Sequence, residues 1–321
     1  MPSAESTIKV PPRWSDDPLS AFLTDAFKNS PASFVPRPGE FDMLLRIHRN
    51  FAKICDNLSN PPDFLAALLI VRSHGAYLAA VRQTTSGHLP ESYPLLRACL
   101  EYALYALHIN RNRGFGVVWL KRHETADSIK AMKKAFQHVK VMETLKAADA
   151  PLHTALETLY ERTIDFGAHP NERGVAGSMT MTESPDRKDF GAKLLDDDDL
   201  ALAHAAKTSA QIGLGALLLF EIIFRDRFRI LGIDLDLETL RRILWAVHMQ
   251  VMASSIVSTA PDIMGGTPVF PSTRVPVQTL LDYIKAGDTI DDFLEGFPSV
   301  SREQVIAFLE RGAILAIIEA G

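Results

Sequence analysis

The chain has 321 residues, of which 47% are hydrophobic, and this allows one large or two moderate globular domains with a real core. Its formal net charge of −5 disfavours a general affinity for nucleic acid. The two cysteines, Cys55 and Cys99, lie in apolar helical patterns and are expected to be buried, reduced thiols. The segment Met1 to Arg13 lacks the apolar stretch of a signal peptide, and the strongest apolar run, Ile212 to Phe224, is too short to cross a bilayer. We therefore expect a soluble cytoplasmic protein without a membrane partner.

The first part of the chain separates into an arm and a helical domain. Residues 1–38 are rich in proline and serine and predict a mobile arm with one short helix around Leu19 to Phe27. Residues 39–250 predict an all-α domain, an antiparallel bundle of six or seven helices with short connections. Its helices are expected at Phe41–Leu58, Phe64–Val81, Ser92–Asn110, Val117–Lys146, Thr154–Phe166, Leu200–Phe228 and Leu235–Val251.

Two segments between these helices have a different character. From Gly174 to Asp189 helical periodicity is lost, and Ser178 to Met181 predict a strand followed by a turn at Ser184 to Asp186. The four aspartates from Asp196 to Asp199 predict the negatively charged start of the next helix. Such a run is a poor metal site without ligands from elsewhere, and the chain has no HExxH, CxxC or glycine-rich phosphate motif. We therefore expect neither a metal ion nor a cofactor.

Arg162 and His169 form the first candidate site in the helical domain. Seven residues are almost two helical turns, so the two side chains share a face about 10 Å apart along the axis if the helix reaches His169. The pattern of an arginine followed by a histidine resembles the motif of the HEPN helical family, found in RNA-cleaving toxins and abortive-infection proteins. That resemblance implies metal-independent RNA cleavage, with His169 moving the proton of the 2′-hydroxyl and Arg162 stabilising the charge on phosphorus. The family usually has Asn, Asp or His after the arginine, where this chain has Thr163. The alternative is a histidine that merely packs near the end of its helix.

A second candidate site lies on the helix Ser92–Asn110. Arg97 and Glu101 are one turn apart, and Tyr105 and His108 follow on the same face. Because the rest of this helix is almost entirely apolar, the four side chains predict a partly buried polar stripe, which becomes a polar pocket if it faces the first site. The alternative is an ordinary surface ion pair. The segment from Lys121 to Lys146 carries seven basic residues and is either a solvated face or an RNA contact.

The C-terminal part of the chain predicts a separate small domain. Residues 251–260 are expected to be a linker, and residues 261–321 a three-helix, helix-turn-helix-like domain with a short β-hairpin around Pro271 to Thr273. Gly287 is expected to end the first helix in a left-handed conformation, and Asp288 or Thr289 to cap the second. Ser301 and Gln304 are expected to form a capping box at the start of the third helix, with Val300 and Val305 as its hydrophobic staple.

This segment also resembles a known family. The resemblance rests on Gly265 to Val269, Thr273 to Val277, Gly287-Asp288 and Phe297-Pro298. It points to the domain of unknown function 433, a small bacterial domain similar to antitoxins with a homeodomain-like core of three helices. Family members usually carry Arg-Gly where this chain has Pro271-Ser272, which affects the turn before Thr273.

The charges of this domain bear on its partner. Residues 261–321 contain four basic and nine acidic residues. A DNA-binding surface needs lysine and arginine to displace counterions from phosphates, so the electrostatics favour a protein partner although the helix-turn-helix shape suggests DNA. Arg274, Ser301, Arg302 and Gln304 are the candidate residues for contacting a partner or nucleic acid.

Three functions are compatible with this sequence. The first is a toxin–antitoxin-related fusion, in which a helical bundle is joined to an antitoxin-like module that binds a toxin or the chain itself. The second is a metal-independent ribonuclease that uses Arg162 and His169. The third is a DNA-binding transcriptional regulator in which the bundle dimerises or senses. We also expect the chain to form a homo-oligomer.

Overall fold

The computed structural model describes residues 11–112, 114–170, 174–175, 178–184, 187–252, 267–271, 273–302, 304–305 and 308–309. The chain divides into two compact units, Met1–Leu240 and Arg241–Gly321. This boundary falls inside helix α12 (Ile233–Met252), ahead of the linker predicted at residues 251–260. Residues 251–252 of that segment are helical, and residues 253–260 lie outside the described part of the chain.

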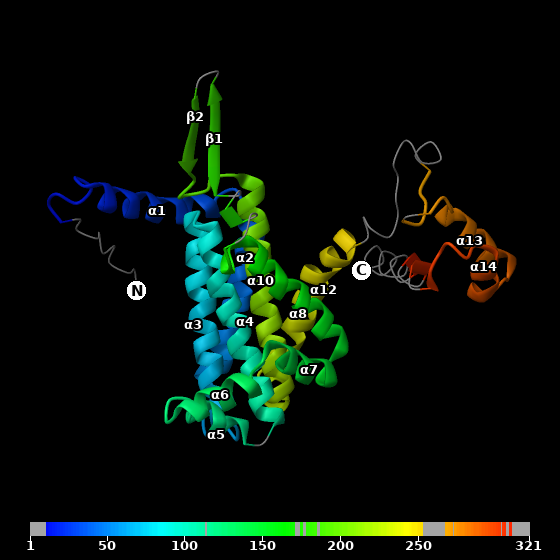
Figure 1. Cartoon of the computed structure of the whole chain (residues 1–321), viewed down its shortest axis with the longest axis horizontal. Coiled ribbons are helices and arrows are strands. Elements are labelled where there is room, and N and C mark those ends of the chain that lie inside the picture. Colours follow the sequence, from blue (N-terminus) through cyan, green and yellow to red (C-terminus); the bar gives the residue numbers. More distant parts are fainter. Residues whose placement is uncertain are drawn as a thin grey trace. The chain divides into compact units, whose positions relative to one another are not determined.

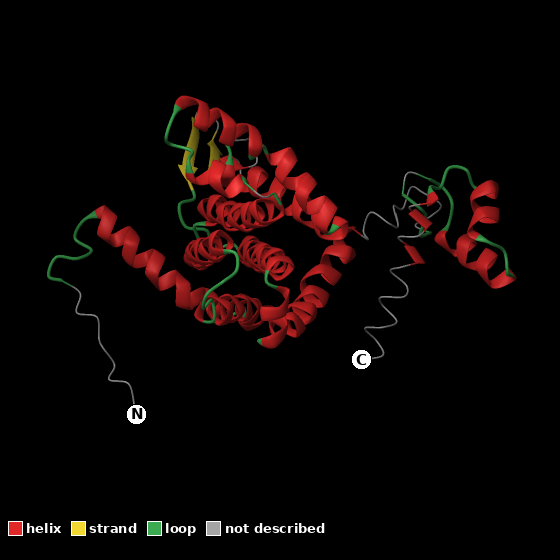
Figure 2. Ribbon diagram, turned by 90° about the horizontal axis from the view of Figure 1, so that it is seen from below, coloured by secondary structure: helices red, strands yellow, loops and turns green. Residues whose placement is uncertain are grey.

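The first unit is the predicted helical bundle (Figures 1 and 2). Its helices before α12 are α1 (Pro18–Phe34), α2 (Pro38–Asp56), α3 (Phe64–Ser86), α4 (Leu89–Arg111), α5 (Phe115–Leu120), α6 (Ala126–Ala135), α7 (His138–Ala148), α8 (Ala150–Thr163), α10 (Asp199–Ile223) and α11 (Arg225–Ile230). Helix α10 packs against α2, α3, α4 and α8, and its side chains from Ser209 to Phe220 are all buried. It is the central helix of the bundle.

The long pair α3 and α4 is joined by a tight turn. Asp63 begins α3 by accepting a hydrogen bond from the backbone nitrogen of Ala66 (3.0 Å). Gly87 ends α3 with a φ of 90°, and a β-carbon there would lie 2.7 Å from the carbonyl oxygen of Asp196. Glycine is therefore required both for the left-handed conformation and for the close approach of the segment before α10.

The N-terminal arm contains a longer helix than the sequence predicts. Helix α1 begins at Pro18, where Asp17 accepts hydrogen bonds from the next backbone nitrogens, and it continues to Phe34. Its second half is fastened to the end of α3, where Asn29 donates to the carbonyl oxygen of Ser86 (3.2 Å) and Ser33 to that of Thr85 (2.9 Å). These bonds hold the helix across the end of the bundle.

The single helix predicted at Val117–Lys146 is wrong, because this segment forms three helices. Thr125 caps α6 through the backbone nitrogen of Ser128 (3.0 Å), and Gln137 adopts an extended conformation before α7. The breaks at Thr125 and Gln137 change the direction of the chain, and Met132, Phe136 and other apolar residues are thereby buried. Tertiary packing thus overrides a helical pattern that is locally continuous.

Two other predicted helices are interrupted. Helix α8 is followed by a π-helical turn, Ile164–Ala168, in which Gly167 has non-helical backbone angles. The predicted helix Leu200–Phe228 is divided at Phe224 into α10 and α11.

The strand predicted at Ser178 to Met181 is confirmed in part, because it begins at Met179 and continues through Ser184, and residues 185–186 of the predicted turn lie outside the described residues. Strands β1 (Met179–Ser184) and β2 (Arg187–Ala192) form an antiparallel hairpin in which Met179 pairs with Ala192 and Ser184 with Arg187. The hairpin projects from the end of the bundle, and every residue of β2 is exposed (Figure 1).

Helices α3 and α10 are long and apolar enough to cross a membrane when judged by length and composition alone. In α10, 78% of the most apolar stretch is buried within the protein, which fits its position as the core helix of the bundle. In α3 the buried share is 39%, so one apolar side of this helix is exposed. Helix α10 has 25 residues and extends beyond the apolar run at Ile212–Phe224.

Both cysteines are free thiols, and Cys99 is fully buried while Cys55 is half-buried. Burial raises the pKa of Cys55 to about 11 and that of Cys99 to about 12, so both are neutral thiols near pH 7.

The second unit contains helices α13 (Val277–Ala286) and α14 (Ile290–Gly296) around a core of its own. That core consists of the buried side chains of Phe270, Val275, Leu280, Phe293, Val300 and Val305. The predicted hairpin is a single antiparallel bridge between Val269 and Pro276, with a further backbone bond from the nitrogen of Phe270 to the oxygen of Val275 (2.9 Å). Ser272 lies outside the described residues.

The predicted helix ends of this unit are confirmed. Gly287 has a φ of 93°, and Thr289 forms a capping box with Asp292. The backbone nitrogen of Ser301 donates to the side-chain oxygen of Gln304 (2.8 Å), and the backbone nitrogen of Gln304 donates to the hydroxyl of Ser301 (3.2 Å). Of the apolar face expected for the third helix, Leu309 packs against the core, whereas Ile306, Ile314 and Ile317 lie outside the described part.

Candidate functional site

The stripe predicted on α4 meets α8 through a three-membered network. Arg97 donates from Nε to Oε1 of Glu101 (2.9 Å) and from Nη2 to the hydroxyl of Tyr160 (2.6 Å). The hydroxyl of Tyr160 in turn donates to Oε1 of Glu101 (3.0 Å). The guanidinium group also lies 4.8 Å from the centre of the tyrosine ring. Each polar group thus has a partner, and the network joins α4 to α8.

His138 extends this network to α7. Its ring stacks on that of Tyr160 with 4.0 Å between the centroids. Burial lowers the pKa of His138, against the opposing effect of Glu101, so the ring is neutral at pH 7. Burial and the charge of Glu101 raise the pKa of the Tyr160 hydroxyl, which therefore stays protonated. The arrangement is charge-balanced and suited to holding helices together.

The other two residues of the predicted stripe, Tyr105 and His108, also make structural contacts. Nε2 of His108 lies 3.1 Å from the carbonyl oxygen of Ala135 and Nδ1 lies 2.7 Å from the hydroxyl of Thr144. Tyr105 packs its ring against Phe136. These residues line up on α4 as predicted, but they face α6 and α7.

Arg162, the first candidate for chemistry, points to the central helix. Its Nη1 donates to Oε1 of Gln211 (3.1 Å) and lies 3.4 Å from the hydroxyl of Thr208. Burial lowers the pKa of the guanidinium, an effect that Tyr93 partly opposes. Gln211 and Thr208, the hydrogen-bond partners of this half-buried cation among the described residues, are both neutral.

His169 does not continue the face of Arg162. It follows the π-helical turn, has extended backbone angles (φ −139°, ψ 147°) and is exposed. The turn at Gly167 ends the helix two residues too early for the spacing of seven to place both side chains on one face. No contact between the two residues is seen in the described part of the chain, and neither of them belongs to the Arg97 network.

A second histidine lies near Arg162. His204 on α10 packs its ring against Phe166 with 5.6 Å between the centroids, and Phe166 stacks on Tyr93 (5.5 Å). Burial lowers the pKa of His204, and the positive charges of Arg162 and Lys207 lower it further. His204 is therefore a neutral imidazole at pH 7 beside a half-buried cation. No sequence pattern predicts that His204 on α10 lies near Arg162 on α8.

The three rings border an open pocket of about 570 Å³ at the end of the bundle from which the hairpin projects. Its polar lining includes Lys193, Asp196, Asp198 and His204. We call this the hairpin-end pocket. It combines an aromatic wall with a few polar groups, as small-molecule sites commonly do.

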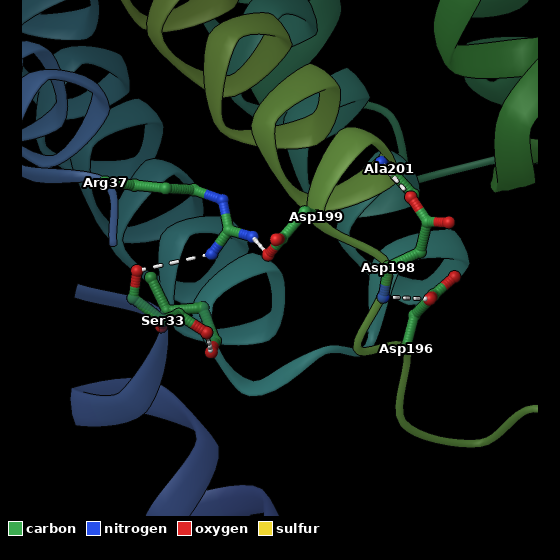
Figure 3. A network of polar contacts seen from close by, with 7 residues as sticks. Ser33, Arg37, Asp196, Asp198, Asp199 and Ala201 are labelled. Carbon is green, nitrogen blue, oxygen red and sulfur yellow. Dashed lines mark hydrogen bonds and ion pairs between the residues drawn. The ribbon is translucent and has the colours of Figure 1, made fainter. Parts of the chain in front are cut away.

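The aspartate run beside this pocket serves the start of α10. Asp198 accepts a hydrogen bond from the backbone nitrogen of Ala201 (2.8 Å), Asp196 accepts from that of Asp198 (2.9 Å), and Asp199 forms an ion pair with Arg37 (Figure 3). The predicted negative helix start is confirmed. The described residues contain no group of three His, Cys, Asp or Glu side chains that could hold a metal ion.

The candidate residues of the second unit have mixed surroundings. Ser301 and Gln304 form the capping box, and Gln304 also donates to the carbonyl oxygen of Pro271 (3.1 Å). Arg302 forms an ion pair with Asp291, whereas Arg274 is exposed. Of the four, Arg274 is the side chain best placed to reach a partner.

Comparison with known proteins informs the second unit only. Residues 257–310 match the family described as "Protein of unknown function (DUF433)". The chain is 43% identical over 53 residues to the uncharacterized protein y4eO of Sinorhizobium fredii (strain NBRC 101917 / NGR234), a match that covers 16% of this chain and 24% of that protein. No solved structure matches the chain. The comparisons lend no support to the HEPN resemblance of residues 39–250. The chain thus carries, at residues 257–310, a DUF433 domain, whose family has no assigned function.

Proposed function

We propose that the protein is a toxin–antitoxin-related fusion, in which the helical bundle is an effector and the DUF433 domain is its partner-binding, controlling module. The observation that carries this proposal is the separate core of the second unit. Phe270, Leu280 and Phe293 are fully buried in a cluster formed by residues of that unit. A module with its own core folds around its own side chains and leaves its surface available for binding.

The charge of the module supports a protein as the partner. Asp282, Asp288, Asp291, Asp292 and Glu295 are exposed on or beside α13 and α14. Arg302 is neutralised by Asp291, which leaves Arg274 and Lys285 as the exposed cations among the described residues of the DUF433 domain. Such a surface repels phosphates and complements a basic protein surface.

Growth of bacteria tests the proposal. Residues 1–252, which end with α12, are expected to slow growth when expressed alone, and the full chain is expected to be tolerated. Equal growth with both, at equal protein levels, would contradict the controlling role of the module. Separate expression of residues 253–321 shows whether control also works between chains.

A ribonuclease activity of the bundle is a second candidate, favoured by the position of His204 beside Arg162. In this reaction the neutral imidazole takes the proton of an RNA 2′-hydroxyl, and the oxygen attacks phosphorus. The bond to the 5′-oxygen breaks, which leaves a 2′,3′-cyclic phosphate and a 5′-hydroxyl that gains a proton from solvent. Arg162 contributes its positive charge to the phosphorane, so no metal ion enters this scheme.

The two histidines give a matched test of this second candidate. Residues 1–252 are incubated with RNA in the presence of EDTA, and 2′,3′-cyclic ends are measured. His204→Gln is expected to abolish cleavage and His169→Gln to leave it unchanged. The reverse result would assign the activity to the pair of Arg162 and His169. The absence of cleavage by unsubstituted residues 1–252 would exclude the ribonuclease.

DNA is the alternative partner of the DUF433 domain. Binding to DNA would be sensitive to salt and would be lost in Arg302→Glu. If DNA binding does not change with salt and is equally strong in Arg302→Glu, a DNA-binding regulator is excluded.

A further inference from the structure

The outer side of α3 carries a row of exposed residues. Phe64, Leu68, Val71 and Leu78 keep 65%, 46%, 53% and 41% of their surface exposed, and Gly75 and Arg82 complete the row. The other sides of α3 pack against α2, α4 and α10, and α1 packs against its C-terminal end. The helix is therefore apolar towards the bundle and also apolar away from it.

The spacing of the row points to a second helix. Its members are residues 64, 68, 71, 75, 78 and 82, which alternate strictly between steps of four and three. This is the heptad spacing of a helix that packs lengthwise along another helix. A solvent-facing side of a bundle helix is ordinarily polar, so the row is unusual for a side that remains in water.

The row is symmetric about residue 73. When two α3 helices lie antiparallel about a two-fold axis at this position, Leu68 faces the second copy's Leu78, and Val71 faces its Gly75. The space into which a β-carbon of Gly75 would point is open, so it can receive the valine. A self-complementary surface of this kind is what a two-fold dimer requires, because each pair occurs twice.

The charges at the two ends of α3 select the antiparallel arrangement. Asp63 caps the N-terminal end, and Arg82 lies near the C-terminal end. An antiparallel pair places Arg82 of one copy beside Asp63 and over the ring of Phe64 of the other, which favours an ion pair and a cation–π contact. A parallel pair would place the two arginines together. The opposed helix dipoles also favour the antiparallel pair.

We propose that α3 is a self-association surface through which two copies of this chain form an antiparallel, two-fold dimer. The surface is formed by Phe64, Leu68, Val71, Gly75, Leu78 and Arg82, and it does not depend on the function proposed for the bundle or for the DUF433 domain.

Sedimentation of the full chain over a wide range of concentrations tests this dimer. The wild type is expected to have twice the mass of one chain, and Leu68→Glu and Leu78→Lys are each expected to have the mass of one chain. Leu23→Glu is the matched control, because Leu23 on α1 is also a helical leucine with 46% of its surface exposed. This control is expected to remain a dimer.

Mixing the two single variants gives the decisive result. In the antiparallel pair, the carboxylate introduced at position 68 of one variant faces the ammonium group introduced at position 78 of the other, and the second Leu68–Leu78 contact is intact. An equal mixture is therefore expected to regain the double mass, which also shows that both variants are folded. A parallel pair or an unrelated interface gives no recovery. A wild type that stays monomeric, an oligomer unaffected by Leu68→Glu, or a mixture without recovery would each overturn the proposal.

Discussion

Gly167 lies so close to Pro90 that a β-carbon at position 167 would be 2.2 Å from the carbonyl oxygen of that proline. This contact joins the π-helical turn to the first turn of α4. It fixes where α8 ends and so explains why Arg162 and His169 are not on one face.

The variant Gly167→Ala is expected to destabilise the bundle by about 1 to 3 kcal/mol, because the turn must move away from α4. Thermal unfolding checks this value. Gly39→Ala in the first turn of α2 is the control, because no heavy atom lies within 4 Å of its β-carbon position. Equal stability of the two variants would mean that the turn is free to shift.

Removing one hydroxyl from the network on α4 is expected to loosen α8. Tyr160→Phe deletes the acceptor of Arg97 and the donor to Glu101 and should cost about 1 to 2 kcal/mol, measured by urea unfolding. Tyr105→Phe is the comparison, since the ring of Tyr105 packs on Phe136. It should leave the free energy of unfolding nearly unchanged, and a loss as large as that of Tyr160→Phe would show that removing any tyrosine hydroxyl from the bundle, and not breaking the network, is responsible.

The pair of His48 and His74 predicts a loss of stability in acid. Their rings are joined by a hydrogen bond of 2.9 Å, and burial, followed by the nearby His48, lowers the pKa of His74 from 6.5 to about 4. Between these two pH values the unfolded chain binds more protons at this site than the folded chain does. The contribution of neutral His74 is therefore complete above pH 6.5 and is lost as the pH falls towards 4.

Unfolding temperatures measured at pH 7 and near pH 4 test this linkage. The wild type is expected to lose more stability between the two pH values than His74→Phe, which can retain the stacking on Phe51. His123→Gln, at an exposed position, should follow the wild type. Parallel curves for the wild type and His74→Phe would rule out His74 as the titrating group.

Two neighbouring aspartates before α10, Asp197 and Asp198, are expected to differ in their contribution to stability. Asp198→Ala removes the cap on Ala201 and is expected to lower the unfolding temperature (Figure 3). Asp197→Ala removes the same charge from an exposed position and should have the smaller effect. If both lower the temperature equally, the charge of the run matters more than the cap.

In the DUF433 domain, stability and binding are expected to separate. Gln304→Ala breaks its bonds to Ser301 and to the oxygen of Pro271 and should speed hydrogen exchange in residues 277–296 of the full chain. Arg274→Ala should leave that exchange unchanged, because this side chain is exposed. Faster exchange in Arg274→Ala would show that Arg274 supports the fold.

The features that the sequence predicts well are those determined by neighbours along the chain. Gly287, the Ser301–Gln304 capping box and the acidic start of α10 involve residues within a turn of one another, so local backbone requirements identify them. Part of β1 is recognisable for the same reason, whereas the sequence does not predict its partner strand β2.

The errors arise where distant segments decide the structure. The breaks near Thr125 and Gln137 are favoured by burial of residues such as Met132 against the bundle, which a continuous helical pattern hides. Likewise, His204 approaches Arg162 only because α8 packs on α10, a relationship between residues about 40 positions apart that no spacing in one helix reveals.

The β1–β2 hairpin has a practical consequence for work on this protein. Its two ends meet at the bundle, where the backbone nitrogen of Lys193 donates to the oxygen of Ser178 (2.7 Å). A fluorescent reporter or an affinity tag could therefore be inserted between these ends. The insertion would only enlarge the hairpin, because the chain leaves the bundle and returns to it at the same point. The helices would keep their neighbours.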